Sequence, residues 1–325
     1  MRVADIEPPM GQGVLFILPG SGVEYAGMGR ALLAEEPAFA RAIRDCDDAA
    51  AGCFERPLHD FLSGAAEQGG PGYRPAALAA FCIGTAAALA ARGVQPRLHL
   101  GCSVGEIAAL VMSGTISPEH AFVFIAAQAE ALARHAPAGT LLFALGPAGI
   151  ERQIADWPDA ALAGIYAPGL VLVAVTSPHA AAVTNRLEAR GATVQRLPLS
   201  KPVHSPLIEG ARTAVLEAAG AVAWRQGAAI LSAATMRPAE PGTEHLWRIC
   251  REPIHFCAAL RHAAYDGIGA AIDIGPSGAM ATAARRASQT GLDCAGFNST
   301  GIVSAGIADS AGLDRAATIV ARHRH

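Results

Sequence analysis

Residues 98–106 read Leu-His-Leu-Gly-Cys-Ser-Val-Gly-Glu, an apolar segment that leads into a serine enclosed by two glycines. This G-x-S-x-G pattern predicts a sharp turn from a buried strand into a helix, with the Ser103 hydroxyl presented above the sheet. Gly101 and Gly105 suit such a turn, because the chain crowds itself on both sides of the serine. The turn also aims the backbone N–H of Val104 at the place where an oxyanion would form. The alternative interpretation is a glycine-rich loop with an incidental serine.

Composition narrows the classes of protein to consider. The chain has 325 residues, enough to bury a large core, and its formal net charge of −3 favours neither a nucleic-acid surface nor a basic membrane patch. Its seven cysteines form no C-x-x-C pair, so we expect no disulfide framework, no metal site and a reduced, cytoplasmic environment. Residues 1–12 lack a signal-peptide pattern. The apolar run 76–91 is short for a membrane span and predicts a buried helix.

Periodicity predicts an α/β protein in two parts. The continuous apolar run 14–18 is typical of a parallel strand that is covered on both faces. Residues 138–198 follow the order strand-helix-strand-strand-helix-strand, which predicts a small ferredoxin-like subdomain. We expect this subdomain to be inserted into one larger domain formed by residues 1–137 and 199–325. The tail from Ser288 is polar and glycine-rich, and its pattern predicts no clear element.

Several segments, in order along the chain, resemble motifs of the acyltransferase family. That family includes malonyl-CoA:acyl-carrier-protein transacylases and the acyltransferase domains of polyketide synthases. The segments are PGSG at 19–22, YAGMGR at 25–30, GCSVGE at 101–106, LSKPVHSPL at 199–207, WRICREPIHF at 247–256 and DIGP at 273–276. The resemblance implies a large α/β-hydrolase-like domain with a mostly parallel sheet, plus the small inserted ferredoxin-like subdomain.

The resemblance also implies ping-pong acyl transfer through an acyl-serine intermediate. Ser103 would attack a thioester, and His204 would take its proton and later return one. The backbone N–H groups of Ser21 and Val104 would form the oxyanion hole, with Ser21 in place of the family's glutamine. The sequence offers no evident Asp or Glu to orient His204. A backbone carbonyl would then hold the imidazole, and the family pattern assigns that carbonyl to His255.

One departure from the family pattern bears on the substrate. Members that load malonyl or methylmalonyl units carry an arginine where this chain has Gln128. Glutamine cannot offset the cost of burying a carboxylate as a charge-assisted arginine pair does, so we expect an acyl group without a free carboxylate. The other expected substrate-binding residues are Cys102, Tyr166, Val203 and Arg74. Arg74 stands where a glutamine is common and could supply a relocated positive charge, which would weaken this expectation.

The sequence leaves two activities open. One is transfer of a neutral or amino-acid-derived acyl group from a CoA or carrier thioester to an acyl carrier protein, in polyketide or related secondary metabolism. The other is hydrolysis of acyl-carrier-protein thioesters by the same Ser103 and His204, and the two differ in whether a thiol or water accepts the acyl group. Retention of both residues argues against a third possibility, a non-catalytic docking subunit.

We expect the protein to act as a monomer. We also expect no bound cofactor, because acyl-CoA or a phosphopantetheine-linked acyl group enters the reaction as the substrate. An acyl carrier protein is the expected partner, and we expect neither nucleic acid nor a membrane. An acidic carrier protein would need a basic rim around the site. Candidate rim residues are Arg30, Arg92, Arg196, Lys201, Arg248 and Arg251.

Overall fold

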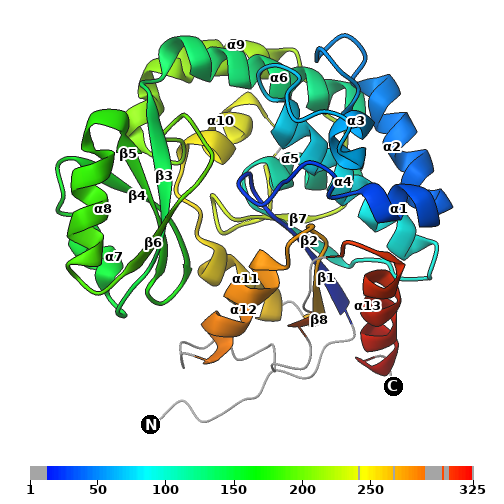
Figure 1. Cartoon of the computed structure of the whole chain (residues 1–325). Helices are drawn as coiled ribbons and strands as arrows, with labels where there is room; N and C mark the ends of the chain where they lie inside the picture. Colours follow the sequence, from blue (N-terminus) through cyan, green and yellow to red (C-terminus); the bar gives the residue numbers. More distant parts are fainter. Residues whose placement is uncertain (1–12, 241, 266–267, 290–301, 304–306, 324–325) are drawn as a thin grey trace.

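Two β-sheets of different kinds organise the chain (Figure 1). The computed structural model describes residues 13–240, 242–265, 268–289, 302–303 and 307–323. The strands of the larger sheet are β1 (Gly13–Leu18), β2 (Leu98–Gly101), β7 (Ile230–Ser232), β8 (Ile268–Asp273) and β9 (Ile302–Val303). They lie in the order β7-β2-β1-β8-β9, and every pairing is parallel. The predicted mostly parallel sheet is therefore confirmed.

The continuous apolar run at the start of the chain forms the central strand of this sheet. β1 pairs with β2 on one side and with β8 on the other. Leu15 and Ile17 belong to one core cluster, whereas Phe16 and Leu18 belong to the opposite one. Because both faces of β1 are covered, its sequence is apolar throughout and does not alternate. Leu18 lies opposite the last residue of β2, so the loops that follow these two strands meet at one edge.

Helices cover both faces of the larger sheet. They are α1 (Arg30–Glu35), α2 (Pro37–Ala49), α3 (Leu58–Ser63), α4 (Tyr73–Ala90), α5 (Val104–Met112), α6 (Pro118–His135), α9 (Arg212–Gly220), α10 (Thr243–Arg251), α11 (Phe256–Tyr265), α12 (Ala279–Gln289) and α13 (Ser310–His323). By length and composition alone α4 could cross a membrane, but 67% of it is buried inside the molecule. It packs against α2 and α5, as a core helix does.

The smaller sheet is antiparallel and lies at one side of the molecule, next to α11 and α12 (Figure 1). Its elements are β3 (Gly139–Leu145), α7 (Ile150–Ile154), β4 (Ala160–Ala167), β5 (Leu170–Thr176), α8 (Ala180–Glu188) and β6 (Thr193–Arg196). The strand order β4-β5-β3-β6 follows from two crossovers through α7 and α8, as in a ferredoxin-like sheet. The predicted subdomain architecture is confirmed.

Alternation along the strands gives the smaller sheet two different faces. Leu142 and Val173 pack in the core beneath α7 and α8. Leu141 and Leu172 point the other way and join a core cluster with residues of the larger part. Because successive strand residues face opposite sides, one strand can build its own core and also line a space between the two sheets.

The expectation that the tail from Ser288 lacks a clear element was wrong for its last segment. α13 contacts α1, α4 and β8, and it buries Leu313, Ala316 and Val320. Their spacing of three and four residues is that of a helix face, but one of the three is a small alanine, which weakens the pattern. Residues 290–301 and 304–306 of this tail lie outside the described residues.

Candidate active site

The predicted turn from strand to helix is present at Ser103. β2 ends at Gly101, α5 begins at Val104, and Ser103 between them has a φ of 55° and a ψ of −127°. This conformation is rare for a residue with a side chain, so the surrounding structure must hold it. The N–H of Glu106 donates to the Ser103 carbonyl at 2.8 Å and closes the turn.

Close packing explains the two glycines of the motif. A Cβ on Gly105 would collide with the carbonyl oxygens of Leu18 and Pro19. A Cβ on Gly101 would collide with backbone atoms of Glu106. Backbone atoms cannot step aside as the end of a flexible side chain can, so neither position accepts a larger residue without moving the turn.

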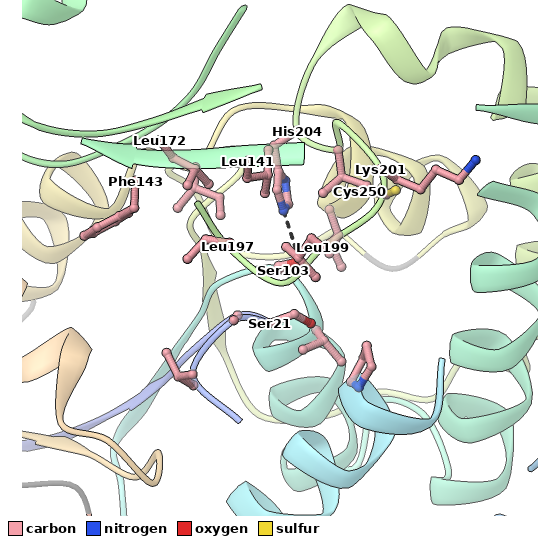
Figure 2. Close-up of a pocket in the computed structure, with 18 of the residues that line it drawn as sticks. Ser21, Ser103, Leu141, Phe143, Leu172, Leu197, Leu199, Lys201, His204 and Cys250 are labelled. Atoms are coloured by element: carbon pink, nitrogen blue, oxygen red, sulfur yellow. Dashed lines mark hydrogen bonds between the residues drawn. The ribbon is translucent and has the colours of Figure 1, made fainter. Parts of the chain in front are cut away.

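The loop after β1 lies directly against this turn. A Cβ on Gly20 would stand 3.1 Å from the Cβ of Ser103, and the next residue, Ser21, lines the same cavity as Ser103 (Figure 2). Val104 is the first residue of α5, where N–H groups have no acceptor inside the helix. Among the described residues, the N–H groups of Ser21 and Val104 have no hydrogen-bond acceptor. The structure thus brings both expected oxyanion-hole residues to the serine.

His204 reaches Ser103 from the segment that leaves the small sheet. Its Nε2 lies 3.1 Å from the Ser103 Oγ, a contact drawn as the dashed line in Figure 2. The backbone N–H of His204 donates to the Cys250 carbonyl at 2.8 Å, which anchors the residue at a φ of 59°. The Ser205 hydroxyl donates to the Pro202 carbonyl at 2.6 Å and closes the loop around the histidine.

The other imidazole nitrogen contacts a carbonyl that differs from the expected one. His204 Nδ1 lies 3.2 Å from the carbonyl oxygen of Glu252, not from that of His255. The His255 carbonyl instead accepts the N–H of Ala259 at 2.9 Å, because it begins the hydrogen bonding of α11. Glu252 follows α10 in extended conformation, as a residue before a proline prefers, and this frees its carbonyl. The assignment to His255 was therefore wrong.

The two contacts determine the tautomer of the imidazole, and its burial determines the charge. A carbonyl oxygen only accepts, so Nδ1 carries the hydrogen and Nε2 is left to accept the Ser103 hydroxyl proton. Burial lowers the pKa of His204 to about 4, and the Glu252 carbonyl offsets only part of that effect. His204 is therefore neutral at pH 7 and has the protonation state of a general base.

Ser103 and His204 open onto a cavity of about 670 Å³ between the two parts of the molecule. Its apolar lining comes from both parts; examples are Ile125 and Leu132 of α6, Leu141, Phe143 and Leu172 of the small sheet, and Met280 of α12. Figure 2 shows the small-sheet side chains directed toward the space beside Ser103. An apolar space next to a nucleophile and a base suits an acyl chain.

Three of the expected substrate-binding residues line this cavity, namely Gln128, Tyr166 and Val203. Gln128 is a lone polar group on the inner face of α6, and its Nε2 is buried without a hydrogen-bond partner among the described residues. Because buried donors are normally hydrogen-bonded, we expect a bound molecule to supply an acceptor for the Gln128 Nε2.

The other two, Arg74 and Cys102, do not belong to the cavity lining. Arg74 Nη2 donates to the Glu24 carbonyl at 3.1 Å, which directs the guanidinium to the loop after β1. Cys102 is fully buried in the core cluster that contains Tyr166, since the turn exposes its central residue and not that residue's neighbour. Burial raises the pKa of the Cys102 thiol, so it is not a nucleophile. Both expectations of direct substrate contact were wrong.

Most of the candidate rim cations already have partners. Arg30 donates to the Ser63 carbonyl, Arg92 to Glu36 and Asp314, and Arg251 to Glu209. The Lys201 ammonium donates to the carbonyl oxygens of Ala133 and Ala136 at the end of α6, and Figure 2 shows it directed away from Ser103. Arg196 and Arg248 have no side-chain hydrogen bond within the described ranges.

Sequence reasoning missed two residues of the site. Glu252 directly precedes Pro253, and a residue before proline disfavours the helical conformation. This is the one sequence signal that the Glu252 carbonyl lies outside the hydrogen bonding of a helix. Glu24 lies within the loop after β1 and is 5% exposed, and no local pattern marks it. Over the described part of the chain, no group of three His, Cys, Asp or Glu side chains gathers as a set of metal ligands.

Comparison with known sequences matches nearly the whole chain. A family model described as the acyl transferase domain matches residues 15–322. The chain is 31% identical over 288 residues to an erythronolide synthase of Saccharopolyspora erythraea, a match covering 85% of this chain and 9% of that protein. It is 29% identical over 272 residues to the mycoketide-CoA synthase of Mycobacterium tuberculosis, a match covering 82% of this chain and 6% of that protein. The chain thus spans under a tenth of the length of these relatives.

Solved structures share the fold. The acyltransferase domain from module 8 of the salinomycin polyketide synthase superimposes with a TM-score of 0.83 at 25% identity, over 95% of this chain and 75% of that one. The acyl-carrier-protein S-malonyltransferase of Burkholderia pseudomallei gives a TM-score of 0.79 at 21% identity, over 94% and 99%. The predicted α/β-hydrolase-like architecture with a small inserted subdomain is the architecture of these domains.

Proposed function

The chain belongs to the acyl transferase family, and we propose that it moves an acyl group without a free carboxylate from a thioester to an acyl carrier protein, through an acyl-serine intermediate. The observation that carries the proposal is the 3.1 Å contact between His204 Nε2 and Ser103 Oγ beside an apolar cavity of about 670 Å³. We place the reaction in polyketide or related secondary metabolism.

Acylation of the serine uses each of these groups. As the Ser103 oxygen attacks the thioester carbonyl, His204 Nε2 accepts the hydroxyl proton, and the Glu252 carbonyl holds the resulting imidazolium. The N–H groups of Ser21 and Val104 receive the tetrahedral oxyanion. When the intermediate collapses, the carbon–sulfur bond breaks and the imidazolium returns its proton to the leaving thiolate. The acyl group then remains on Ser103 as an ester.

Transfer to the carrier is the same sequence in reverse. The thiol of the carrier's phosphopantetheine gives its proton to His204 and attacks the ester carbonyl. The intermediate forms in the same oxyanion hole, the bond to the Ser103 oxygen breaks, and the imidazolium returns the proton to that oxygen. One thioester bond is broken and one is made, so the exchange needs no cofactor.

The chemistry of the cavity supports an uncharged acyl group. Gln128 offers only neutral donors. The Lys201 ammonium donates to helix carbonyls, and Arg74, which does not line the cavity, donates through Nη2 to the Glu24 carbonyl. A carboxylate buried without a cation carries a penalty of several kcal/mol. An amide or hydroxyl oxygen along the acyl chain would satisfy the orphaned Gln128 Nε2 without that penalty, as in an amino-acid-derived acyl group.

Intact-mass spectrometry after incubation with a panel of acyl thioesters tests the reaction. The protein should gain the mass of a neutral acyl group, and added acyl carrier protein should take that mass over. Ser103→Ala should abolish labelling, whereas Ser200→Ala, at another serine lining the cavity, should not. Labelling of Ser103→Ala to the wild-type mass would end the nucleophile assignment. Loss of the acyl mass to water in the presence of the carrier would make the protein a hydrolase.

The acyl class has its own test. Gln128→Arg should raise loading from malonyl thioesters, because the guanidinium supplies a charge-assisted pair for the carboxylate. Gln195→Arg is the matched control, since Gln195 is an exposed glutamine on the lining of the same cavity and should leave loading unchanged. Unchanged malonyl loading in Gln128→Arg would mean that this position does not contact the acyl group.

A further inference from the structure

A buried carboxylate organises the loop that carries Ser21. The Oε2 of Glu24 accepts the N–H of Gly22 at 2.6 Å. Burial raises the pKa of this carboxyl, and the backbone N–H groups of residues 22–24 and the Arg74 charge offset part of that effect. Glu24 is 5% exposed. A carboxylate that gathers successive backbone N–H groups fixes their peptide planes, because each bond sets the direction of one N–H.

A cation contacts the same residue at its carbonyl and its carboxylate. Arg74, near the start of α4, donates through Nη2 to the Glu24 carbonyl at 3.1 Å, and its Nε lies 4.0 Å from the Glu24 Oε1. The guanidinium also stands over the ring of Phe61, 5.7 Å from its centroid. Arg74 is therefore held against Glu24 and away from the acyl cavity.

Two neighbouring N–H groups of the loop differ in whether they have an acceptor. The Glu24 carboxylate accepts the N–H of Gly22, whereas the N–H of Ser21 has no acceptor among the described residues. Gly20, on the other side of Ser21, packs against the elbow with a would-be Cβ 3.1 Å from the Ser103 Cβ. Ser21 is thus fixed between an anchored carboxylate and the serine turn, and its donor remains for the cavity.

We propose that Glu24 and Arg74 are positioning residues that orient the Ser21 N–H as an oxyanion donor. The inference rests on the proposed function, since an oxyanion forms here only if Ser103 attacks an acyl carbonyl. Neither side chain lines the cavity. Glu24 fixes the peptide between Ser21 and Gly22, which adjoins the Gly20–Ser21 peptide that carries the Ser21 N–H, and Arg74 holds Glu24 through its carbonyl. Their chemistry is complementary, so one without the other leaves a desolvated charge beside the loop.

Three variants separate positioning from simple stability. Glu24→Ala removes the acceptor of the Gly22 N–H, and Arg74→Gln leaves the Glu24 carboxylate without its cation. The double variant Glu24→Gln/Arg74→Gln restores a neutral pair in which an amide oxygen can still accept from Gly22. The control is Arg186→Gln, which breaks the ion pair of Arg186 with Asp159 in the small subdomain, where the Nη1–Oδ1 distance is 2.8 Å; neither residue lines the cavity.

The readout is the single-turnover rate of Ser103 acylation by an acyl-pantetheine thioester, together with kcat, KM and the melting temperature. Glu24→Ala should lower the acylation rate and kcat by about 100-fold with little change in KM, as for loss of one oxyanion donor. The double variant should recover at least a tenth of the wild-type rate. Arg186→Gln should melt earlier but acylate at the wild-type rate.

The outcomes distinguish this inference from the function on which it rests. If wild-type protein is never acylated at Ser103, the proposed function fails. If wild type is acylated and Glu24→Ala reacts at the same rate, only the positioning role fails. An equal loss of rate in Arg186→Gln would also overturn it, because the loss would then reflect stability. Should Glu24→Ala not fold, Arg74→Gln decides in its place, and a wild-type kcat there refutes the pairing.

Discussion

The buried imidazole of His204 should work as a base far into the acid range. Burial lowers its pKa to about 4, from an ordinary value of 6.5. Protonation removes the lone pair of Nε2 that accepts the Ser103 proton, so kcat/KM should fall as the pH falls through the folded-state pKa. The pH at the midpoint of that fall reports how far His204 is shielded from water in the free enzyme.

The two pKa values give different profiles. With a pKa of about 4, the neutral fraction of His204 is close to 1 at pH 7 and about 0.9 at pH 5, so the rate should fall by only about a tenth. With an unperturbed pKa of 6.5, the neutral fraction would drop from about 0.76 to about 0.03 over the same interval, a fall of roughly 25-fold. An assay of ordinary precision separates these profiles.

Acid also acts on the fold, and with a known sign. In the unfolded chain His204 binds a proton near pH 6.5, whereas in the folded protein it does so only near pH 4. Between these values the unfolded state holds more protons, so stability falls as the pH falls, by about 3 kcal/mol for this group. Quenched single-turnover acylation, with a fluorescence check of folding at each pH, keeps the two effects apart.

His99 provides a matched control for this measurement. It is also buried, with its pKa lowered to about 4 by desolvation, but it lies in β2 beside Phe16 and does not line the cavity. His99→Gln should remove part of the acid sensitivity of folding and leave the rate profile of acylation unchanged. A wild-type profile with its midpoint near pH 6.5 would refute the reasoning, because it would mean a solvated imidazole.

Three further changes test the packing around the site. Gly105→Ala pushes a methyl group into two carbonyl oxygens of the neighbouring loop; it should abolish acylation and lower the free energy of unfolding by about 1–3 kcal/mol in urea, and an active variant would contradict the proposed role of the turn. Glu106→Ala leaves the buried His245 Nε2 and the Ser232 hydroxyl without their carboxylate partner, so the free energy of unfolding in urea should fall by about 1–3 kcal/mol for each group; an unchanged value would contradict this role. Leu313→Ala should cost about 2–5 kcal/mol without changing the acylation rate; no loss of stability would mean that α13 does not belong to the core.

The turn at Ser103 could be predicted from sequence because its motif is contiguous. Gly101 is required by backbone atoms of Glu106, five residues further on, whereas Gly105 is required by the carbonyls of Leu18 and Pro19, where the strand next to β2 ends. The ferredoxin-like order could be predicted for a similar reason, since each strand alternates and each turn is marked. The partnership of Ser103 with His204 spans 101 residues of sequence, and only the resemblance to a family pointed to it.

The errors concern groups whose direction depends on distant backbone. Whether a carbonyl at Glu252 or at His255 meets the imidazole is decided by where α10 ends and α11 begins, a shift of three residues. Arg74 has a long side chain that could reach the cavity or the loop after β1. The Glu24 carbonyl and carboxylate settle its direction, and they come from a segment 50 residues away.

The proposed reaction is stabilised by dipoles and not by ions, and this bears on the acyl group. The oxyanion meets two N–H groups and the imidazolium meets one carbonyl, while the Lys201 ammonium is bonded to helix carbonyls. A free carboxylate held in the same apolar cavity would add a second negative charge near the developing oxyanion. Arginine would neutralise that charge, but Gln128 cannot. The carboxylate would therefore raise the barrier of the acylation step itself as well as weaken binding, so discrimination against malonyl groups is expected in kcat and not in KM alone.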